Sequence, residues 1–161
     1  VVGDKRGGRS TERLEQRPHL LDRVQSVVGV PTRVVHVVRN PFDNISTMLR
    51  RGGRRATLDE MVDRYLTAVA VNAGLRTRLG PERCTDVRHE DLLARPEQVL
   101  ADLCTFVGLE ADAEYLSACA GILFPEPRRT RHEAPWTAPL QARVEAAIEE
   151  RDFLRGYAFA D

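Results

Sequence analysis

The feature that most constrains the fold is an apolar run, Val34 to Val38, that ends abruptly at Arg39. A run of β-branched residues is typical of a strand in a parallel sheet that is covered on both faces. Asn40 is a good N-cap, and Pro41 suits the first position of a helix. Arg39 is therefore expected where a strand gives way to a helix. Open α/β sheets bind their ligands at that carboxyl edge.

Strand and helix patterns alternate along the rest of the chain, which predicts an α/β fold with a mainly parallel sheet. A second short strand is expected over 84–88. A loop over 124–136 and an aromatic tail over 153–159 are expected to complete the domain. The expected helices are 10–29 (divided at Pro18), 40–51, 57–79, 96–107, 112–120 and one that begins after Thr137.

The charges and cysteines limit the kinds of partner. The 24 basic and 24 acidic side chains cancel, so bulk charge gives no argument for binding nucleic acid or a membrane. Neither the three cysteines nor the four histidines have the spacing of metal ligands, so no metal site is expected. An odd number of cysteines does not make a disulfide framework, and this favours a reducing compartment such as the cytoplasm.

The start of the chain resembles the interior of a domain. Residues 1–5 look like a strand that enters a glycine-rich turn, and no signal peptide or bilayer-spanning stretch is recognisable. This pattern favours a fragment, with residues 1–161 forming one partial domain. An upstream anchor would place the protein in the Golgi lumen rather than the cytoplasm, so the compartment stays open.

Arg39 and the hydroxyl groups that follow it suggest an anion site. A guanidinium can bind two oxygens of a phosphate monoester, and a hydroxyl can donate to a third. Successive helical residues point about 100° apart, so Ser46 and Thr47 do not both face the same anion. The alternative is an ion pair between Arg39 and Asp43, with both hydroxyl groups solvated. The residues alone leave both interpretations open.

Four motifs, in order along the chain, resemble those of the sulfotransferase family. Gly3-Asp4-Lys5 resembles its G-[DE]-K turn. Arg39 to Thr47 resembles its motif for the 3′-phosphate of 3′-phosphoadenosine 5′-phosphosulfate, in which a hydroxyl follows a strand-end arginine by eight residues. Thr47 has this spacing, and Ser46 does not. The segments 87–109 and 129–159 resemble the family's RYEDL segment and its C-terminal region.

This resemblance implies a P-loop NTPase-like parallel sheet flanked by helices. It also implies an enzyme that transfers a sulfuryl group from that nucleotide donor to an acceptor hydroxyl. Arg39 and Thr47 would bind the 3′-phosphate, and Thr130 and Arg131 would help close the nucleotide site. Lys5 would stabilise charge on the leaving oxygen, as the lysine of this turn does in relatives that modify protein tyrosines. The expected partner is a hydroxyl-bearing small molecule, glycan or protein, with no nucleic acid and no metal.

Two departures from the family pattern matter. The chain lacks a G-x-x-x-x-G-K-[ST] loop, so the first strand and P-loop are expected upstream, together with the general base. The isolated chain is then expected to be weak or inactive. His89 also stands where the family usually carries tyrosine.

Two other functions remain open on the sequence. One is a non-catalytic nucleotide- or anion-binding domain that lost the P-loop by evolution. The other is a nucleotide kinase, which the missing Walker lysine and the Arg39–Thr47 spacing disfavour. Three further features favour plain structural roles: a solvated basic loop at 50–55, a packing anchor at Trp136 and a hydrogen-bonded core histidine at His36.

Overall fold

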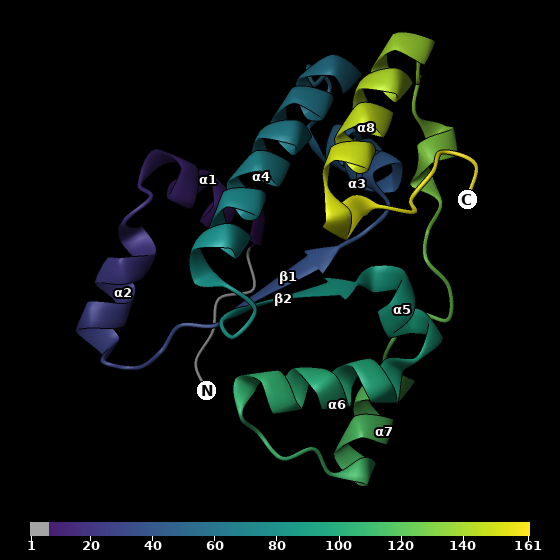
Figure 1. Ribbon diagram of the computed structural model, residues 1–161. Helices are drawn as coiled ribbons and strands as arrows, with labels where there is room; N and C mark the ends of the chain where they lie inside the picture. The colour runs from purple at the N-terminus through teal and green to yellow at the C-terminus, as the bar shows by residue number, and fades with distance from the viewer. Residues whose placement is uncertain (1–6) are drawn as a thin grey trace.

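The computed structural model describes residues 7–161. Residues 1–6, which contain Lys5 and its Gly3-Asp4-Lys5 turn, lie outside the described residues. The described part has a small parallel sheet flanked by helices, which confirms the α/β class (Figure 1). Its elements are α1 (Gly7–Gln16), α2 (Leu20–Val28), β1 (Val34–Val38), α3 (Pro41–Arg51), α4 (Leu58–Leu79), β2 (Cys84–Arg88), α5 (His89–Ala94), α6 (Pro96–Val107), α7 (Ala113–Gly121), η1 (Thr130–Glu133), α8 (Ala138–Glu150) and η2 (Asp152–Leu154).

The two strands set the direction of the described structure. β1 pairs with β2 in parallel, with Val34 opposite Cys84 and Val38 opposite Arg88. Both strands therefore end at the same edge of the sheet, where β1 leads into α3 and β2 leads into α5. Arg39 lies at this carboxyl edge, as predicted.

The two faces of the sheet are covered unequally. α3, α4 and α8 lie on one side, and α6 and α7 lie on the other (Figure 1). On the second side, Val87 of β2 is buried and lines a small hollow together with residues of α6. Val35 and Val37 of β1 are instead 38% and 58% exposed. The expectation that β1 is covered on both faces is wrong for the described structure, because α6 lies over β2 and leaves these valines open.

Asn40 fixes the start of α3. Its side-chain Oδ1 accepts the Phe42 amide at 3.0 Å, and Pro41 occupies the first turn, where no donor is lost. Its Nδ2 also donates to the Ala158 carbonyl at 2.9 Å. The N-cap therefore anchors the C-terminal tail as well as the helix.

The main core lies between α3, α4, α8 and the tail. Burial of each large apolar side chain contributes roughly 1.5–3 kcal/mol. The tail supplies Phe153, Leu154 and Tyr157, which confirms that it packs back on the core. The other buried members are Val38, Phe42, Ile45, Leu58, Met61, Val62, Tyr65, Val69, Val144 and Ile148.

Most helix ends fall where the sequence predicts. α6 stops at Gly108, whose φ of +79° lies in the left-handed region that favours glycine. Two details differ. Helix α5 was not predicted, because six residues are too few for a helical repeat to be recognised. Thr137 precedes α8, but its side chain makes no capping hydrogen bond.

Two threonines at helix starts share a backbone conformation but differ in their side-chain bonds. Thr57 and Thr137 have nearly the same backbone conformation, with ψ of 156° and 155°. Thr57 Oγ1 accepts the Glu60 amide at 3.3 Å, whereas Thr137 makes no such bond. We expect Thr57→Ala to lower the free energy of unfolding by about 1 kcal/mol, and Thr137→Ala to lower it by much less. Urea denaturation of both variants measures the difference, and equal losses would contradict the capping assignment.

The same capping box makes stability depend on pH. The Thr57 amide, and then its hydroxyl, hold the pKa of the Glu60 carboxyl below its usual value. This contribution is present above the unfolded pKa of Glu60 and is lost as pH falls through the folded pKa. We therefore expect the stability gap between wild type and Glu60→Gln to close in acid. Thermal melts at several pH values check this, and a gap that does not change with pH would oppose it.

Candidate functional site

Arg39 extends from the carboxyl end of β1 and is held by two partners. Its Nη1 donates to Thr47 Oγ1 at 3.4 Å, and its Nη2 donates to the main-chain carbonyl of Arg128. The side chain is 20% exposed. Its Nε is buried and has no hydrogen-bond partner among the described residues. The guanidinium therefore stands at the sheet edge with its buried Nε–H unused.

The two adjacent hydroxyl groups of α3 have different partners. Ser46 Oγ accepts the indole N–H of Trp136 at 3.1 Å and is buried. Thr47 instead lies against Arg39. The helical rotation between neighbouring residues thus separates them as the sequence predicts. The contact joins Arg39 to the hydroxyl eight positions later, which is the spacing of the family motif.

Thr130, which begins η1, extends this hydroxyl cluster. Its hydroxyl donates to the main-chain carbonyl of Asp43 at 2.8 Å and lies 3.1 Å from Thr47 Oγ1. A hydroxyl has one hydrogen, so Thr47 donates to Thr130 and accepts from Arg39. The structure thus brings together three of the predicted site residues, Arg39, Thr47 and Thr130.

Arg131 lies in a different environment from Arg39. It is only 3% exposed, and its Nε and Nη2 donate to the two carboxylate oxygens of Asp43 at 3.1 and 2.7 Å. Its Nη1 donates to the carbonyls of Ala158 and Phe159. All three guanidinium nitrogens of Arg131 are engaged. This pair also binds η1 to α3 and to the tail.

The Asp43 carboxylate lies close to Arg39 as well. Its Oδ2 is 3.9 Å from Arg39 Nη2, which is beyond hydrogen-bond distance but near enough for charge attraction. The alternative interpretation of the sequence, an Arg39–Asp43 ion pair, is therefore present only as a long contact. The short, bidentate partner of Asp43 is Arg131.

Glu90 is a member of this edge that the sequence did not single out. Its carboxylate accepts the main-chain N–H of Asn40 at 3.0 Å and the Tyr157 hydroxyl at 2.6 Å. Burial, and then the Glu90 carboxylate, raise the pKa of the Tyr157 phenol. Glu90 lies in the RYEDL-like segment, and this resemblance is the sequence feature that could have identified it as a site residue. Its neighbour His89 has a buried Nδ1 without a partner in residues 7–161.

The three features with expected structural roles show no sign of another function, although His36 is half-buried rather than part of the core. Trp136 packs edge to face against Phe42, with ring centroids 5.1 Å apart. His36 bonds Asp86 at 2.8 Å and Asn72 at 3.2 Å. The four arginines of the 50–55 segment are exposed, and the first two of them lie in the last turn of α3 rather than in a loop.

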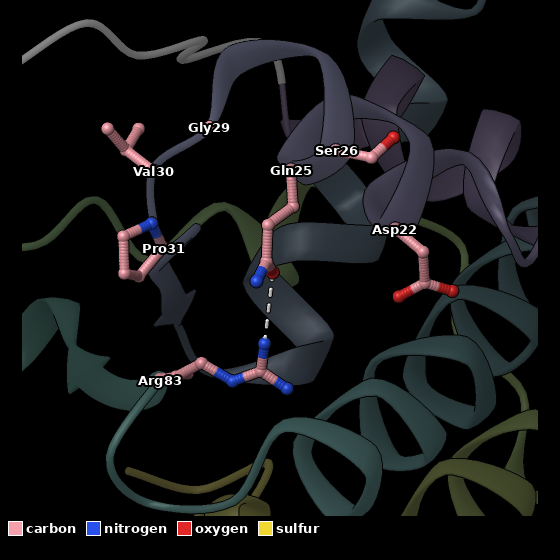
Figure 2. Close-up of a pocket in the computed structure, with 7 residues that line it drawn as sticks. All are labelled: Asp22, Gln25, Ser26, Gly29, Val30, Pro31 and Arg83. Carbon is pink, nitrogen blue, oxygen red and sulfur yellow. Dashed lines mark hydrogen bonds between the residues drawn. The ribbon is translucent and has the colours of Figure 1, made fainter.

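Two surface hollows of residues 7–161 lie away from Arg39 and Thr47. The larger, about 540 Å³, is at the opposite end of the sheet (Figure 2). There Arg83 and Gln25 point toward each other and bond at 3.1 Å, beside the loop of Val30 and Pro31. The smaller, about 230 Å³, runs along β2 and α6. Neither of these two hollows is lined by Arg39 or Thr47.

Residues 7–161 are the part of the chain in which metal ligands and membrane spans can be assessed. No three His, Cys, Asp or Glu side chains of this part lie close enough together to hold a metal ion. None of its helices combines the length and the apolar character that crossing a bilayer requires. Lys5 lies outside this part of the chain, so its place relative to Arg39 is not described.

Comparison with solved structures identifies a similar fold. The chain resembles the sulfotransferase domain from the curacin biosynthetic pathway, with a TM-score of 0.56 and 17% sequence identity. The match covers 84% of this chain and 59% of the other. This chain therefore spans less than two thirds of that relative, and the likeness shows the fold alone. A search of the curated proteins gave no match.

Comparison with protein families identifies the family itself. The family model described as the sulfotransferase family matches residues 31–113, which is more than half of the 161 residues. The matched range includes β1, the Arg39 to Thr47 motif and the segment from β2 through α6. The resemblance first noted from short motifs is thus confirmed: this chain belongs to the sulfotransferase family.

Proposed function

We propose that this chain binds the 3′-phosphate of 3′-phosphoadenosine 5′-phosphosulfate, as part of an enzyme that transfers the sulfuryl group to an acceptor hydroxyl. Membership of the family supports a sulfuryl donor of this kind. The single observation that carries the proposal is the contact between Arg39 and Thr47 at the carboxyl edge of the sheet. Open α/β sheets bind nucleotides at this edge.

The residues present fit a phosphate group. The unused Arg39 Nε is a buried donor that an anion would satisfy. Thr47 could turn its hydroxyl hydrogen from Thr130 to an anion, while Thr130 keeps its own bond to the Asp43 carbonyl. Arg39 would have to release the Arg128 carbonyl for two-point binding. Arg39 and Thr47 are thus proposed as the ligands, and Thr130 as the group that closes the site beside them.

Lys5 is proposed as the catalytic cation. Sulfuryl transfer, by analogy with phosphoryl transfer, develops negative charge on the leaving oxygen. An ammonium placed there stabilises the transition state more than the ground state. The proposal for Lys5 rests on the resemblance of its turn to that of the family.

We further propose that residues 1–161 are the C-terminal portion of a P-loop-like domain. The chain spans 59% of the solved domain it matches. In the described residues β1 pairs only with β2, and Val35 and Val37 are exposed on one face. Upstream strands could pair with β1 and bury these valines. The isolated chain would then lack part of the donor site and would transfer sulfuryl weakly or not at all.

A non-catalytic binding domain is the second candidate. One observation favours it: Arg39, Thr47 and Thr130 already contact one another although residues 7–161 contain no P-loop. The gene upstream of the Val1 codon separates the two candidates. A strand followed by a loop rich in glycine, serine and threonine supports the enzyme, whereas a start codon next to Val1 supports the binding domain.

Calorimetric titration tests the proposed phosphate ligands. We define the 3′-phosphate preference as the ratio of the affinities for adenosine 3′,5′-bisphosphate and adenosine 5′-phosphate. We expect wild type to prefer the bisphosphate, also over ATP, which a nucleotide kinase would bind better. Thr47→Ala should lower the preference about tenfold or more, because it removes a hydrogen bond to a charged group.

Ser46→Ala is the matched control for Thr47→Ala. It removes the neighbouring hydroxyl and leaves the Trp136 indole without its acceptor, at a cost of about 1–3 kcal/mol in stability. We expect it to leave the 3′-phosphate preference unchanged. Equal effects of the two substitutions on the preference would contradict the assignment of Thr47.

Turnover of the longest natural form of the protein tests Lys5. We expect Lys5→Ala to reduce kcat on the order of 10²-fold, because the charge on the leaving oxygen loses its neutralising cation. Arg54→Ala, in the exposed basic loop, is the control and should keep full turnover. If Lys5→Ala also kept full turnover, the catalytic role would be lost.

A further inference from the structure

We propose that Arg131 is a positioning residue that holds the Asp43 carboxylate away from Arg39, and so keeps the Arg39 guanidinium from pairing with that carboxylate instead of an anion. The inference rests on the proposed function, since that anion is the 3′-phosphate of the nucleotide. It assigns Arg131 an indirect role rather than direct contact with the nucleotide.

Asp43 and Arg131 form a buried pair. Asp43 is 1% exposed and Arg131 is 3% exposed. The carboxylate accepts three bonds from Arg131: the main-chain amide at 2.9 Å, Nε at 3.1 Å and Nη2 at 2.7 Å. A buried charge without such partners is strongly destabilising, so the pair holds both groups in place.

Arg39 and Arg131 compete for the same oxygen. Asp43 Oδ2 lies 2.7 Å from Arg131 Nη2 and 3.9 Å from Arg39 Nη2. Arg39 and Asp43 are four residues apart along the chain, and Asp43 lies in the first turn of α3. If Arg131 were absent, Arg39 would be the remaining cation within 4 Å of this carboxylate in residues 7–161. The cost of burying an unpaired charge would then draw Asp43 to Arg39.

The count of charges leads to the same conclusion. Arg39, Asp43 and Arg131 together carry one net positive charge. If residue 131 were neutral, the three side chains would have no net charge, and the Arg39 N–H groups would bind the carboxylate. Both changes weaken attraction to a phosphate, because an anion needs an unbalanced charge as well as donors.

Arg131 itself has little to offer a nucleotide directly. Its three nitrogens are engaged by Asp43 and by the carbonyls of Ala158 and Phe159. Its side chain is 4% exposed, against 20% for Arg39. The two arginines thus have different roles: Arg39 faces the anion, and Arg131 binds the competing carboxylate.

The test measures the 3′-phosphate preference of the longest natural form of the protein by calorimetric titration with the two nucleotides defined above. The variants are Arg131→Met, Asp43→Asn and the double variant Asp43→Asn/Arg131→Met. We expect Arg131→Met to lower the preference on the order of tenfold to a hundredfold. Asp43→Asn and the double variant should keep it, because a neutral amide does not capture Arg39. Arg143→Met is the control, since Arg143 pairs with Asp59 and Asp63 on the surface.

Circular dichroism establishes which variants fold. If Arg131→Met alone fails to fold, the double variant decides, because it leaves no buried charge unpaired. A folded double variant that has lost the preference would overturn the inference, since this is the result expected if Arg131 bound the nucleotide itself. A folded Arg131→Met that keeps the preference would overturn it as well. If wild type shows no preference, the proposed function fails, and the inference fails with it.

Discussion

A buried carboxylate at the first turn of α3 is the group on which the candidate site depends. Taking Asp43 out of water costs several kcal/mol unless cations and donors surround it. Arg131 supplies them from a segment 88 positions later in the chain. It also donates to carbonyls of the C-terminal tail. The single ion pair therefore joins α3, η1 and the tail at the carboxyl edge of the sheet, beside Arg39.

The chemistry at that edge follows from this arrangement. A guanidinium with a spare donor and an uncompensated charge, next to a threonine hydroxyl, is suited to a phosphate monoester. Thr130 orients Thr47 by the hydrogen bond between them, and it is itself fixed by the Asp43 carbonyl. Membership of the sulfotransferase family supports sulfuryl transfer as the proposed reaction of this arrangement.

The sequence was sufficient to predict the features that depend on residues close together in the chain. The valine run, the Arg39-Asn40-Pro41 boundary and the Thr57 capping box placed β1, α3 and α4, and the helical rotation separated Ser46 from Thr47. Pairs of residues that are far apart in the chain could not be predicted. Nothing near Arg131 in the sequence shows that its partner is Asp43, because nearby residues report turns and helix faces but not tertiary partners. The exposure of Val35 and Val37 likewise depends on which helix packs over which strand.

The most direct measurement is the nuclear magnetic resonance signal of the Arg39 Nε–H group, assigned by its loss in Arg39→Lys. In the chain alone this donor is buried and has no partner in residues 7–161. Binding of a phosphate to Arg39 should shift the resonance when adenosine 3′,5′-bisphosphate is added, and much less when adenosine 5′-phosphate is added. A resonance that stays in place with both nucleotides, or moves equally with both, would contradict Arg39 as the group that binds the 3′-phosphate.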